Sequence, residues 1–360
     1  MVLSEEQEAI VNATENRIAV IGPPGTGKTR VLTERIKRLV ESGVQPQDIA
    51  AITFTNVAAN EMKSRLPNSD GMFIGTMHSL ALHILLSNGI NVNIDEMVRK
   101  NDFSKLIYAV NDNPLLKKPA VKYLFVDEVQ DLCQHEFTFI NNLIYDNLFL
   151  CGDVDQCIYQ FKGANPTFFN SYCKDRNTKL YILTHNFRCG QNIINFADYF
   201  VEDIREIDFQ VEGNLQKRGW VQRTDFDDAL FELYNAKSYG NWFILTRTNS
   251  ELAEISNKLE SFNIPYTSFK QGDLTNEEIK ELLQNDKVKL LTIHSAKGLE
   301  TDNVIVVGAR TWSNEERCIA YVAATRARSM VYWCPSVATP KRKKSYNTKT
   351  KPTRPVIKWD

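Results

Sequence analysis

The 360-residue sequence lacks several features that mark particular classes of protein. No apolar run approaches the roughly 20 residues that a membrane-spanning helix needs, and residues 1–10 carry three glutamates where a signal peptide would be apolar. The seven cysteines include no Cys-x-x-Cys pair, which argues against a zinc ribbon or an iron–sulfur cluster. We find no internal repeat. These absences favour a cytoplasmic protein with reduced thiols and no membrane partner.

A net charge near zero conceals an uneven distribution. The formal net charge is −1, yet residues 341–358 contain eight Lys or Arg and no acidic residue. Acidic side chains are therefore in excess over the rest of the chain, so a nucleic-acid partner would have to bind in a local groove. The basic segment could add a sequence-independent grip on phosphates, or it could be a solvated chain end.

Apolar segments of strand length alternate with helical patterns along the whole chain. The predicted strands are Ile18–Ile21, Ile49–Thr53, Met72–Ile74, Tyr123–Val126, Leu148–Cys151, Leu180–Leu183, Trp242–Thr246, Val288–Ile293, Val304–Val307 and Met330–Trp333. The predicted helices include Asn56–Leu66, Met97–Val110, Cys189–Phe200, Ser250–Phe262 and Glu315–Thr325. This alternation predicts an α/β fold with two mainly parallel sheets and helices on both faces of each. The expected division is a first domain at 1–183, a second at 184–336 and a basic tail at 337–360.

A glycine-rich segment follows the first predicted strand. Residues 22–29 read Gly-Pro-Pro-Gly-Thr-Gly-Lys-Thr, the phosphate-binding loop found between a strand and a helix. Its backbone N–H groups can converge on a polyphosphate, and the helix that begins near Gly27 points its positive end at the same anion. Lys28 supplies a charge for the β- and γ-phosphates, and the Thr29 hydroxyl is placed to bind Mg²⁺. The predicted nucleotide-binding residues are Gly22, Pro23, Pro24, Gly25, Thr26, Gly27, Lys28 and Thr29.

The second candidate site is an acidic segment at Tyr123 to Asp131. It reads Tyr-Leu-Phe-Val-Asp-Glu-Val-Gln-Asp. Its apolar strand delivers Asp127 and Glu128 to the carboxyl edge of a parallel sheet, where such folds bind their ligands. We expect Asp127 to hold Mg²⁺. Glu128 is the candidate base that deprotonates the water attacking the γ-phosphate. Two acids that cap a strand are the alternative for an isolated Asp-Glu pair.

From residue 3 to about residue 333 the chain resembles the superfamily 1 helicases of the UvrD/Rep/PcrA type. The resemblance rests on an ordered series of motifs rather than on any single one. Besides the two sites above, the motifs lie at 3–10, 51–66, 75–80, 152–164, 186–188, 291–300 and 321–326. The resemblance implies two RecA-like P-loop NTPase domains, with ATP and Mg²⁺ as cofactors.

The resemblance assigns catalytic and nucleotide-contacting roles outside the phosphate loop. Arg188 and Arg326 would reach the γ-phosphate from the second domain, and Gln156 would sense it from the first. Placed across the domain gap, the arginines would make hydrolysis depend on closure. The remaining implied contacts are adenine recognition by Gln7, Phe187 and Arg30 and a ribose contact by Glu300.

A third group of residues is implied to bind DNA. Phe54 and Phe161 would be platforms on which unpaired bases stack, although Phe161 replaces the larger tryptophan usual in the family. The other implied DNA contacts are Thr55, Asn56, His78, Tyr159, Lys162, His294 and Lys297. For Phe54 a place in the apolar core is the alternative, and for the two histidines it is ordinary hydrogen bonding.

The intervals that hold large insertions in the family are short here, with a reduced insertion at about 82–120 and about 20 residues between Tyr266 and Lys287. The sequence therefore predicts a compact ATP-dependent translocase and helicase. Its expected polarity is 3′ to 5′, its partners are single-stranded DNA and its junctions with duplex, and its expected state is monomeric. A nucleotide-gated DNA clamp without turnover is the main alternative, and a small-molecule kinase is a third. We expect a viral or mobile-element origin from the small size.

Overall fold

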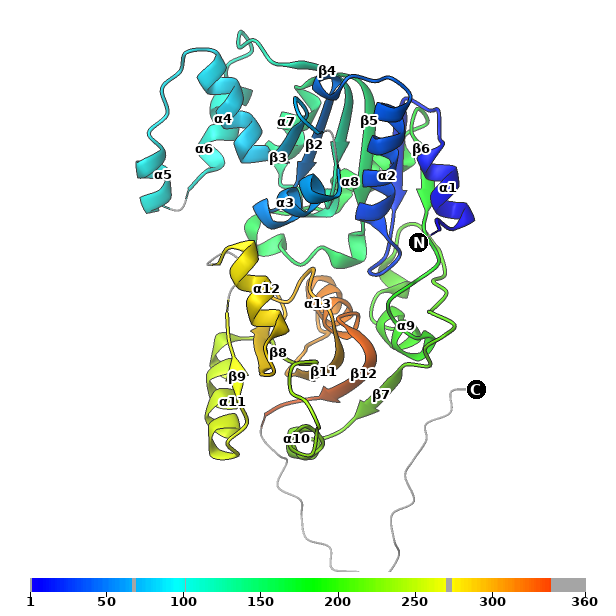
Figure 1. The fold of residues 1–360 in the computed structure, drawn as a ribbon, viewed down its shortest axis with the longest axis vertical. Helices are drawn as coiled ribbons and strands as arrows, with labels where there is room; N and C mark the ends of the chain where they lie inside the picture. Colours follow the sequence, from blue (N-terminus) through cyan, green and yellow to red (C-terminus); the bar gives the residue numbers. More distant parts are fainter. Residues whose placement is uncertain (1, 67–68, 101, 270–273, 338–360) are drawn as a thin grey trace, which may run out of the picture.

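The computed structural model describes residues 2–66, 69–100, 102–269 and 274–337. Figure 1 shows two α/β units, one formed by the blue-to-green part of the chain and one by the green-to-orange part. Each unit has a six-stranded sheet in which all neighbouring strands are parallel. The predicted α/β class with two parallel sheets is confirmed. The basic segment 341–358 lies outside the described residues.

The first sheet has the strand order β3-β2-β4-β5-β1-β6. Its helices and strands are α1 (Glu5–Val11), β1 (Arg17–Ile21), α2 (Lys28–Glu41), β2 (Ile49–Thr53), α3 (Asn56–Arg65), β3 (Phe73–Thr76), α4 (Met77–Ser87), α5 (Ile94–Lys100), α6 (Ser104–Asn111), β4 (Ala120–Val126), α7 (Gln134–Asn141), β5 (Ile144–Gly152), α8 (Thr167–Lys174) and β6 (Lys179–Ile182). Short 3₁₀ turns occur at η1 (Pro46–Asp48), directly before β2, at η2 (Val129–Asp131), after β4, and at η3 (Val154–Gln156) and η4 (Gln160–Lys162), after β5. In this order β5 lies between β4 and β1. These three parallel strands end at the same edge of the sheet, where the loops that follow them begin.

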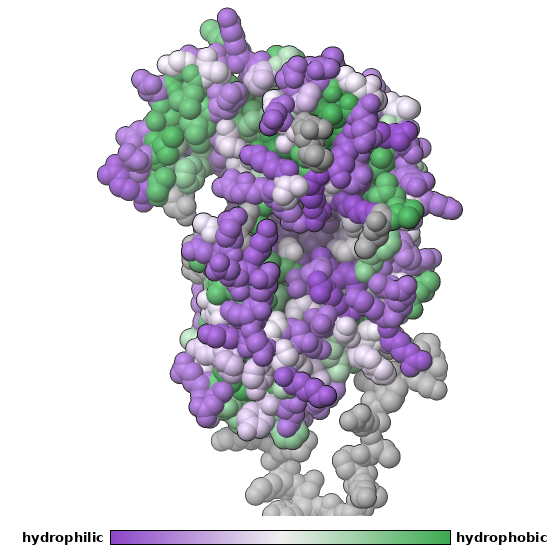
Figure 2. All heavy atoms as spheres, in the orientation of Figure 1, coloured by the Kyte–Doolittle hydropathy of each residue, from purple (hydrophilic) through white to green (hydrophobic). Residues whose placement is uncertain are grey.

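Both faces of the first sheet are covered by helices because successive side chains of its strands point to opposite sides. In β1, Ile18 and Val20 join one buried cluster with α1, α2 and α3, whereas Ala19 and Ile21 join another with α4, α6, α7 and α8. The helices α4, α5 and α6 project sideways from this unit in Figure 1. Figure 2 shows apolar side chains gathered over this projection, where Leu86 of α4 is exposed.

The second sheet has the strand order β7-β12-β11-β8-β10-β9. Its elements are α9 (Gln191–Asp198), η5 (Glu202–Ile204), β7 (Trp220–Arg223), α10 (Phe226–Tyr234), β8 (Trp242–Thr246), α11 (Asn249–Ser261), β9 (Tyr266–Thr267), α12 (Asn276–Gln284), β10 (Val288–Thr292), β11 (Thr301–Val307), α13 (Asn314–Ala324) and β12 (Ala327–Cys334). In β8, Phe243 and Leu245 pack in a cluster with α9 and α13, and Trp242 and Ile244 pack with α10 and α11. The first of these clusters continues into the first unit, so the two units share a buried contact.

Two details of the sequence-based prediction are wrong. The single helix expected at Met97–Val110 is two helices, α5 and α6. Asp102 lies between them and its carboxylate accepts a hydrogen bond from the Ser104 hydroxyl at 2.6 Å, a local side-chain contact that competes with a continuous helix. The strands β7 and β9 were not expected; both are short edge strands with one neighbour each. The chain changes sheet between Ile182 and Trp220, and residue 184 remains our proposed domain boundary.

Within the described residues, the helices are too short or too polar to cross a membrane. The surface is hollowed between the two units, and hydrophilic residues border this recess (Figure 2). The carboxyl edge of the first sheet faces it. The candidate functional groups lie along this recess, which is the junction between the two units.

Candidate nucleotide and nucleic-acid site

The glycine-rich segment forms a tight loop between β1 and α2. Gly25 and Gly27 have backbone φ angles of 81° and 93°, in the left-handed region that glycine enters without strain. The loop is anchored to the sheet by the Gly22 N–H group, which donates to the Gly152 carbonyl at 3.0 Å. The predicted strand–loop–helix context is therefore present, and the amino end of α2 opens at Lys28.

Lys28 is held inside this loop. Its ammonium group donates to the Gly22 carbonyl at 2.6 Å, and only 8% of the residue is exposed. A Cβ atom on Gly22 would lie 2.3 Å from the Lys28 side chain, so no larger residue fits there. The ammonium is therefore fixed where a phosphate bound by the loop would meet it.

Oxygen donors suited to Mg²⁺ lie next to this loop. The Thr29 hydroxyl donates to the Asp127 carboxylate at 3.1 Å, and the two side chains come from α2 and the end of β4. Burial, together with the adjacent charge of Glu128, raises the pKa of Asp127 to about 7 despite the nearby Lys28. A divalent cation would offset that buried negative charge, so these residues fit the predicted Mg²⁺ site.

Glu128 adopts a conformation that is unusual for a residue other than glycine, with φ at 56°. Such strain persists only where the surroundings hold it, and it is concentrated at functional sites. The Gln130 amide donates to the Glu128 carboxylate at 2.5 Å. Burial acts to raise the pKa of Glu128, but the charges of Lys28 and Lys297 outweigh it and lower the pKa. Glu128 is thus ionised and able to accept a proton.

Arg326 reaches this site from the second unit. It is 1% exposed and lies after α13, where its guanidinium donates to the carbonyls of Val322 at 2.9 Å and Leu299 at 3.2 Å. Its Nη2 atom also donates to the Gln156 side chain at 3.4 Å, across the junction. Burial lowers the pKa of Arg326 to about 10, with Arg188 adding to the effect, so the side chain keeps its charge at neutral pH.

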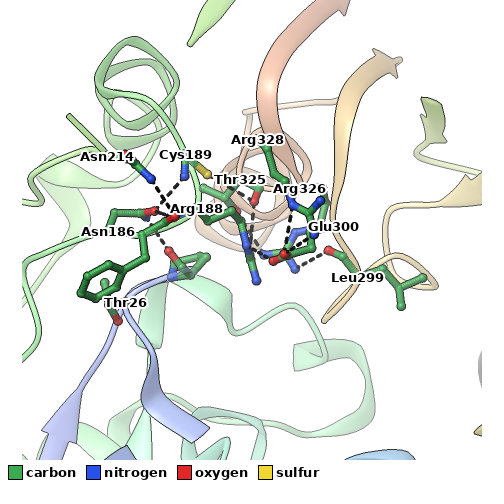
Figure 3. Close-up of polar contacts among 12 residues, drawn as sticks. Thr26, Asn186, Arg188, Cys189, Asn214, Leu299, Glu300, Thr325, Arg326 and Arg328 are labelled. Atoms are coloured by element: carbon green, nitrogen blue, oxygen red, sulfur yellow. Dashed lines mark hydrogen bonds and ion pairs between the residues drawn. The ribbon is translucent and has the colours of Figure 1, made fainter. Parts of the chain in front are cut away.

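Arg188 lies between the phosphate loop and Arg326 (Figure 3). A Cβ atom on Gly25 would be 2.6 Å from that of Arg188, so the two segments are in close contact. The Arg188 guanidinium pairs with Glu300, which also accepts a hydrogen bond from Arg328 at 2.7 Å. Both candidate arginines therefore lie at the junction between the units, and Glu300 already pairs with two cations, so its contact with a ribose stays a prediction.

The residues predicted to recognise the nucleoside surround the same loop. The Gln7 amide donates to the Thr26 carbonyl at 3.0 Å, and its oxygen accepts the Ser4 N–H at 3.2 Å. Phe187 is 40% exposed, and its N–H donates to the Gly25 carbonyl at 2.8 Å. Arg30 contacts the Val2 carbonyl at 3.3 Å. Their contacts with adenine stay predictions.

Aromatic and basic side chains from both units meet beside the junction. Phe54 is half-buried and stacks on Tyr159, with ring centroids 5.5 Å apart, so it is not a core residue. Phe161 is 65% exposed and meets the His294 ring edge-on at 5.4 Å, while the Lys162 ammonium lies 5.1 Å from the Tyr159 ring. These side chains form a surface of the kind on which unpaired bases stack.

Three further predicted DNA contacts lie at the starts of α3 and α4. Thr55 caps α3 by accepting the Ala58 N–H at 3.1 Å, and Asn56 is exposed at the start of that helix. His78 lies at the start of α4 and packs edge-on against Phe103 at 6.4 Å. Burial lowers the pKa of His78, which favours the neutral imidazole.

Lys297, another predicted DNA contact, lies in the contact between the two units. Its ammonium group pairs with the Asp131 carboxylate at 2.5 Å and donates to the Gln156 carbonyl at 2.8 Å. Only 10% of the Lys297 side chain is exposed, and its ammonium group also lies 5.0 Å from the centre of the Tyr159 ring, so a DNA contact by this residue stays a prediction. Asp131 closes the acidic segment, but its sequence position gave no indication of this partner 166 residues away.

The motif at 186–188 was recognised from the sequence, but no role was assigned to Asn186, which joins the phosphate loop to the second unit. Asn186 is fully buried and donates its side-chain N–H to the Pro24 carbonyl at 2.6 Å (Figure 3). Its side-chain oxygen accepts the backbone N–H groups of Arg188 at 2.8 Å and Cys189 at 2.9 Å. Asn186 thereby sets the position of Arg188 relative to the loop.

A second missed feature is a buried ion-pair group that joins the two units. Arg205, after η5, contacts the Asp155 carboxylate at 2.5 Å and the Asp198 carboxylate at 2.6 Å, and the Arg205 side chain is 3% exposed. Removing one partner of a buried pair leaves the other charges uncompensated, so Arg205→Ala should cost about 3–5 kcal/mol of stability. Chemical denaturation followed by circular dichroism measures this.

The control is an exposed pair of similar composition. Lys174 and Glu206 are 55% and 45% exposed at their side chains, and Lys174→Ala should change stability by about 1 kcal/mol or less. Equal effects of the two substitutions would show that the Arg205 group contributes no more than a surface pair.

Two parallel sheets, a phosphate loop after the first strand and arginines of the second unit at the junction define a two-domain P-loop NTPase. The family model described as the UvrD/REP helicase N-terminal domain matches residues 3–118 and 102–177, and the UvrD-like helicase C-terminal domain matches residues 269–335. The chain belongs to the UvrD/Rep family of superfamily 1 helicases.

Curated relatives agree with this placement. The ATP-dependent DNA helicase PcrA of Leuconostoc citreum is 26% identical over 74% of this chain and 49% of its own length. A protein of Acanthamoeba polyphaga mimivirus named "Putative ATP-dependent DNA helicase R568" is 30% identical over 92% of this chain and 53% of its own. PcrA of Bacillus subtilis is 27% identical over 56% of this chain and 39% of its own. The chain thus spans about half the length of the relatives it matches, or less.

Proposed function

We propose that this chain is an ATP-dependent translocase on single-stranded DNA that separates strands as a 3′-to-5′ helicase. The observation that carries the proposal is the reach of Arg326 from the second unit to Gln156 in the first, close enough to Glu128 for the arginine charge to help lower the pKa of that carboxyl. A site completed by two units can couple hydrolysis to their relative motion. The relatives are named ATP-dependent DNA helicases, which supports DNA as the substrate and ATP as the nucleotide that is hydrolysed.

The residues divide the chemistry of hydrolysis among themselves. Thr29 and Asp127 would hold Mg²⁺, which neutralises phosphate charge when bound. Glu128 accepts the proton of the attacking water. Lys28 from the first unit and Arg188 and Arg326 from the second place positive charge where the γ-phosphate gains negative charge in the transition state.

A short path connects this chemistry to the proposed DNA surface. Gln156, which contacts Arg326, is three residues from Tyr159 in the chain, and its carbonyl accepts the Lys297 ammonium. The His294 ring lies 3.1 Å from the Ile158 carbonyl. Movement of the second unit toward the nucleotide therefore also moves groups that touch the aromatic surface.

Polarity is tested by displacement of streptavidin from biotinylated single strands. With ATP, the protein should displace streptavidin from the 5′ end much faster than from the 3′ end, because a 3′-to-5′ motor runs toward the 5′ end. Unwinding of a 3′-tailed duplex, but not of a 5′-tailed one, is the matching result. Faster displacement from the 3′ end would refute the proposed direction.

The clamp alternative makes an opposite prediction about turnover. For a motor, Lys28→Ala should abolish ATP hydrolysis and leave binding to an oligonucleotide intact, because Lys28 lies in the phosphate loop away from the aromatic surface. For a clamp, the unmodified chain would bind single strands and show no hydrolysis to lose. A kinase would require a small-molecule acceptor and leave the aromatic surface without a role.

A further inference from the structure

Three potential metal ligands meet at the start of α7, outside the residues used for nucleotide and DNA. The Cys133 sulfur lies 3.1 Å from Nδ1 of His135 and 3.0 Å from the Glu136 carboxylate. One donor atom from each of the three residues lies within 4.8 Å of the others. The cluster was not visible as a Cys-x-x-Cys motif, because its donors are a thiol, an imidazole and a carboxylate.

Local packing holds the three side chains in place. Cys133 is the residue before α7, and its N–H donates to the Glu136 carboxylate at 2.9 Å, as in a capping box. The His135 ring stacks on Tyr108 of α6, with centroids 4.6 Å apart and planes 25° apart. A capping box explains the position of Glu136, but it does not require an imidazole at the sulfur.

We propose that Cys133, His135 and Glu136 form a zinc-binding site. Zinc binds sulfur at about 2.3 Å and nitrogen or oxygen at about 2.0–2.2 Å in tetrahedral geometry, which separates neighbouring ligand atoms by about 3.6 Å. The contacts of the Cys133 sulfur, 3.0 to 3.4 Å, lie a few tenths of an ångström below this. The side chains would have to shift outward, and the imidazole, whose two nitrogens both lie near the sulfur, would have to turn one nitrogen toward the ion.

The charges and donor types favour zinc over magnesium. A thiolate and a carboxylate together balance the two positive charges of the ion, and the mixed sulfur, nitrogen and oxygen set suits a borderline-soft metal. Zinc would replace the proton of the Cys133 thiol, which donates to the Glu136 carboxylate at 3.0 Å in the metal-free chain. Three protein ligands leave the fourth position for water.

The site lies where zinc would join two functional segments. Leu132, directly after Asp131, accepts the Asn165 N–H at 2.9 Å, and a Cβ atom on Gly163 would be 3.6 Å from that of Cys133. Bound zinc would therefore stiffen the contact between the acidic segment and the loop that carries Phe161. This role is independent of whether the chain translocates on DNA.

Zinc titration of the full chain against a chromophoric chelator tests the proposal. We expect one equivalent of Zn²⁺ to bind. Both Cys133→Ser and His135→Gln should weaken zinc binding by more than about 100-fold, a larger loss than that caused by replacing a residue that only contacts a metal ligand. The matched controls Cys334→Ser, a buried thiol of the second unit, and His83→Gln, an exposed imidazole of α4, should bind as the unmodified chain does.

A second readout needs no substitution. Of the seven free cysteines, all in the described part of the chain, Cys133 is half-buried and the others are buried. Zinc should slow alkylation of Cys133 by iodoacetamide, followed by mass spectrometry, and Co²⁺ should give a thiolate charge-transfer absorption. Less than stoichiometric zinc, equal affinity in the Cys133 and His135 variants, or unprotected Cys133 at saturating zinc would overturn the proposal.

Discussion

Replacing Arg326 by alanine should lower kcat for ATP hydrolysis by about 10³- to 10⁵-fold, the range for an arginine that stabilises a phosphoryl-transfer transition state. The reason is its position: it is buried, charged and within 3.4 Å of Gln156 across the junction. Arg326→Lys should not restore the rate, because lysine lacks the planar fork that contacts Val322, Leu299 and Gln156 together. Steady-state hydrolysis with saturating single-stranded DNA measures kcat.

Loss of folding would imitate this result, so the variant also needs a nucleotide-binding measurement. Arg326→Ala should still bind a fluorescent ATP analogue, since Lys28 and the phosphate loop are untouched. Arg223→Ala is the matched control, because Arg223 is an exposed arginine of β7 whose guanidinium lies 5.5 Å from the centre of the Phe196 ring. A folded Arg326→Ala protein that keeps kcat within about tenfold would remove Arg326 from the transition state.

Glu128→Gln should lower kcat by about 10²- to 10⁴-fold, the usual contribution of a general base. The glutamine side chain has nearly the same shape and can still contact Gln130, so ATP and DNA binding should persist. We therefore expect the Glu128→Gln variant to keep ATP bound without hydrolysing it and to bind single strands without translocating. Rapid-quench hydrolysis and fluorescence anisotropy of a labelled oligonucleotide measure the two properties.

An unchanged hydrolysis rate in Glu128→Gln would assign the base to another group. Asp131→Asn distinguishes loss of the general base from loss of the contact between the units, because Asp131 pairs with Lys297. We expect Asp131→Asn to weaken the contact between the units and to reduce DNA stimulation more than basal hydrolysis.

The parts of the site that could be predicted from sequence are those that a short segment builds by itself. The phosphate loop needs only Gly25, Gly27 and Lys28 at fixed spacing between a strand and a helix, and β4 brings Asp127 to the right edge because parallel strands end together. The ordered motifs then placed Arg188 and Arg326 in the second unit. The two parallel sheets followed from the same alternation of strands and helices.

The parts that could not be predicted depend on partners far apart in the chain. Lys297 with Asp131, and Arg205 with Asp155, are ion pairs between units that no local pattern indicates. Glu300 is held by Arg188 and Arg328, so the expected ribose contact would compete with two cations. The strand β9 has two residues and one neighbour, too little to produce a recognisable alternation.

The central claim is that DNA on the aromatic surface accelerates chemistry at the junction of the two units. Single-turnover ATP hydrolysis with and without a long oligonucleotide tests it most directly. Our account predicts that the oligonucleotide speeds the hydrolysis step itself, and that Phe161→Ala reduces this acceleration without weakening ATP binding. A single-turnover rate that is the same with and without DNA would contradict it.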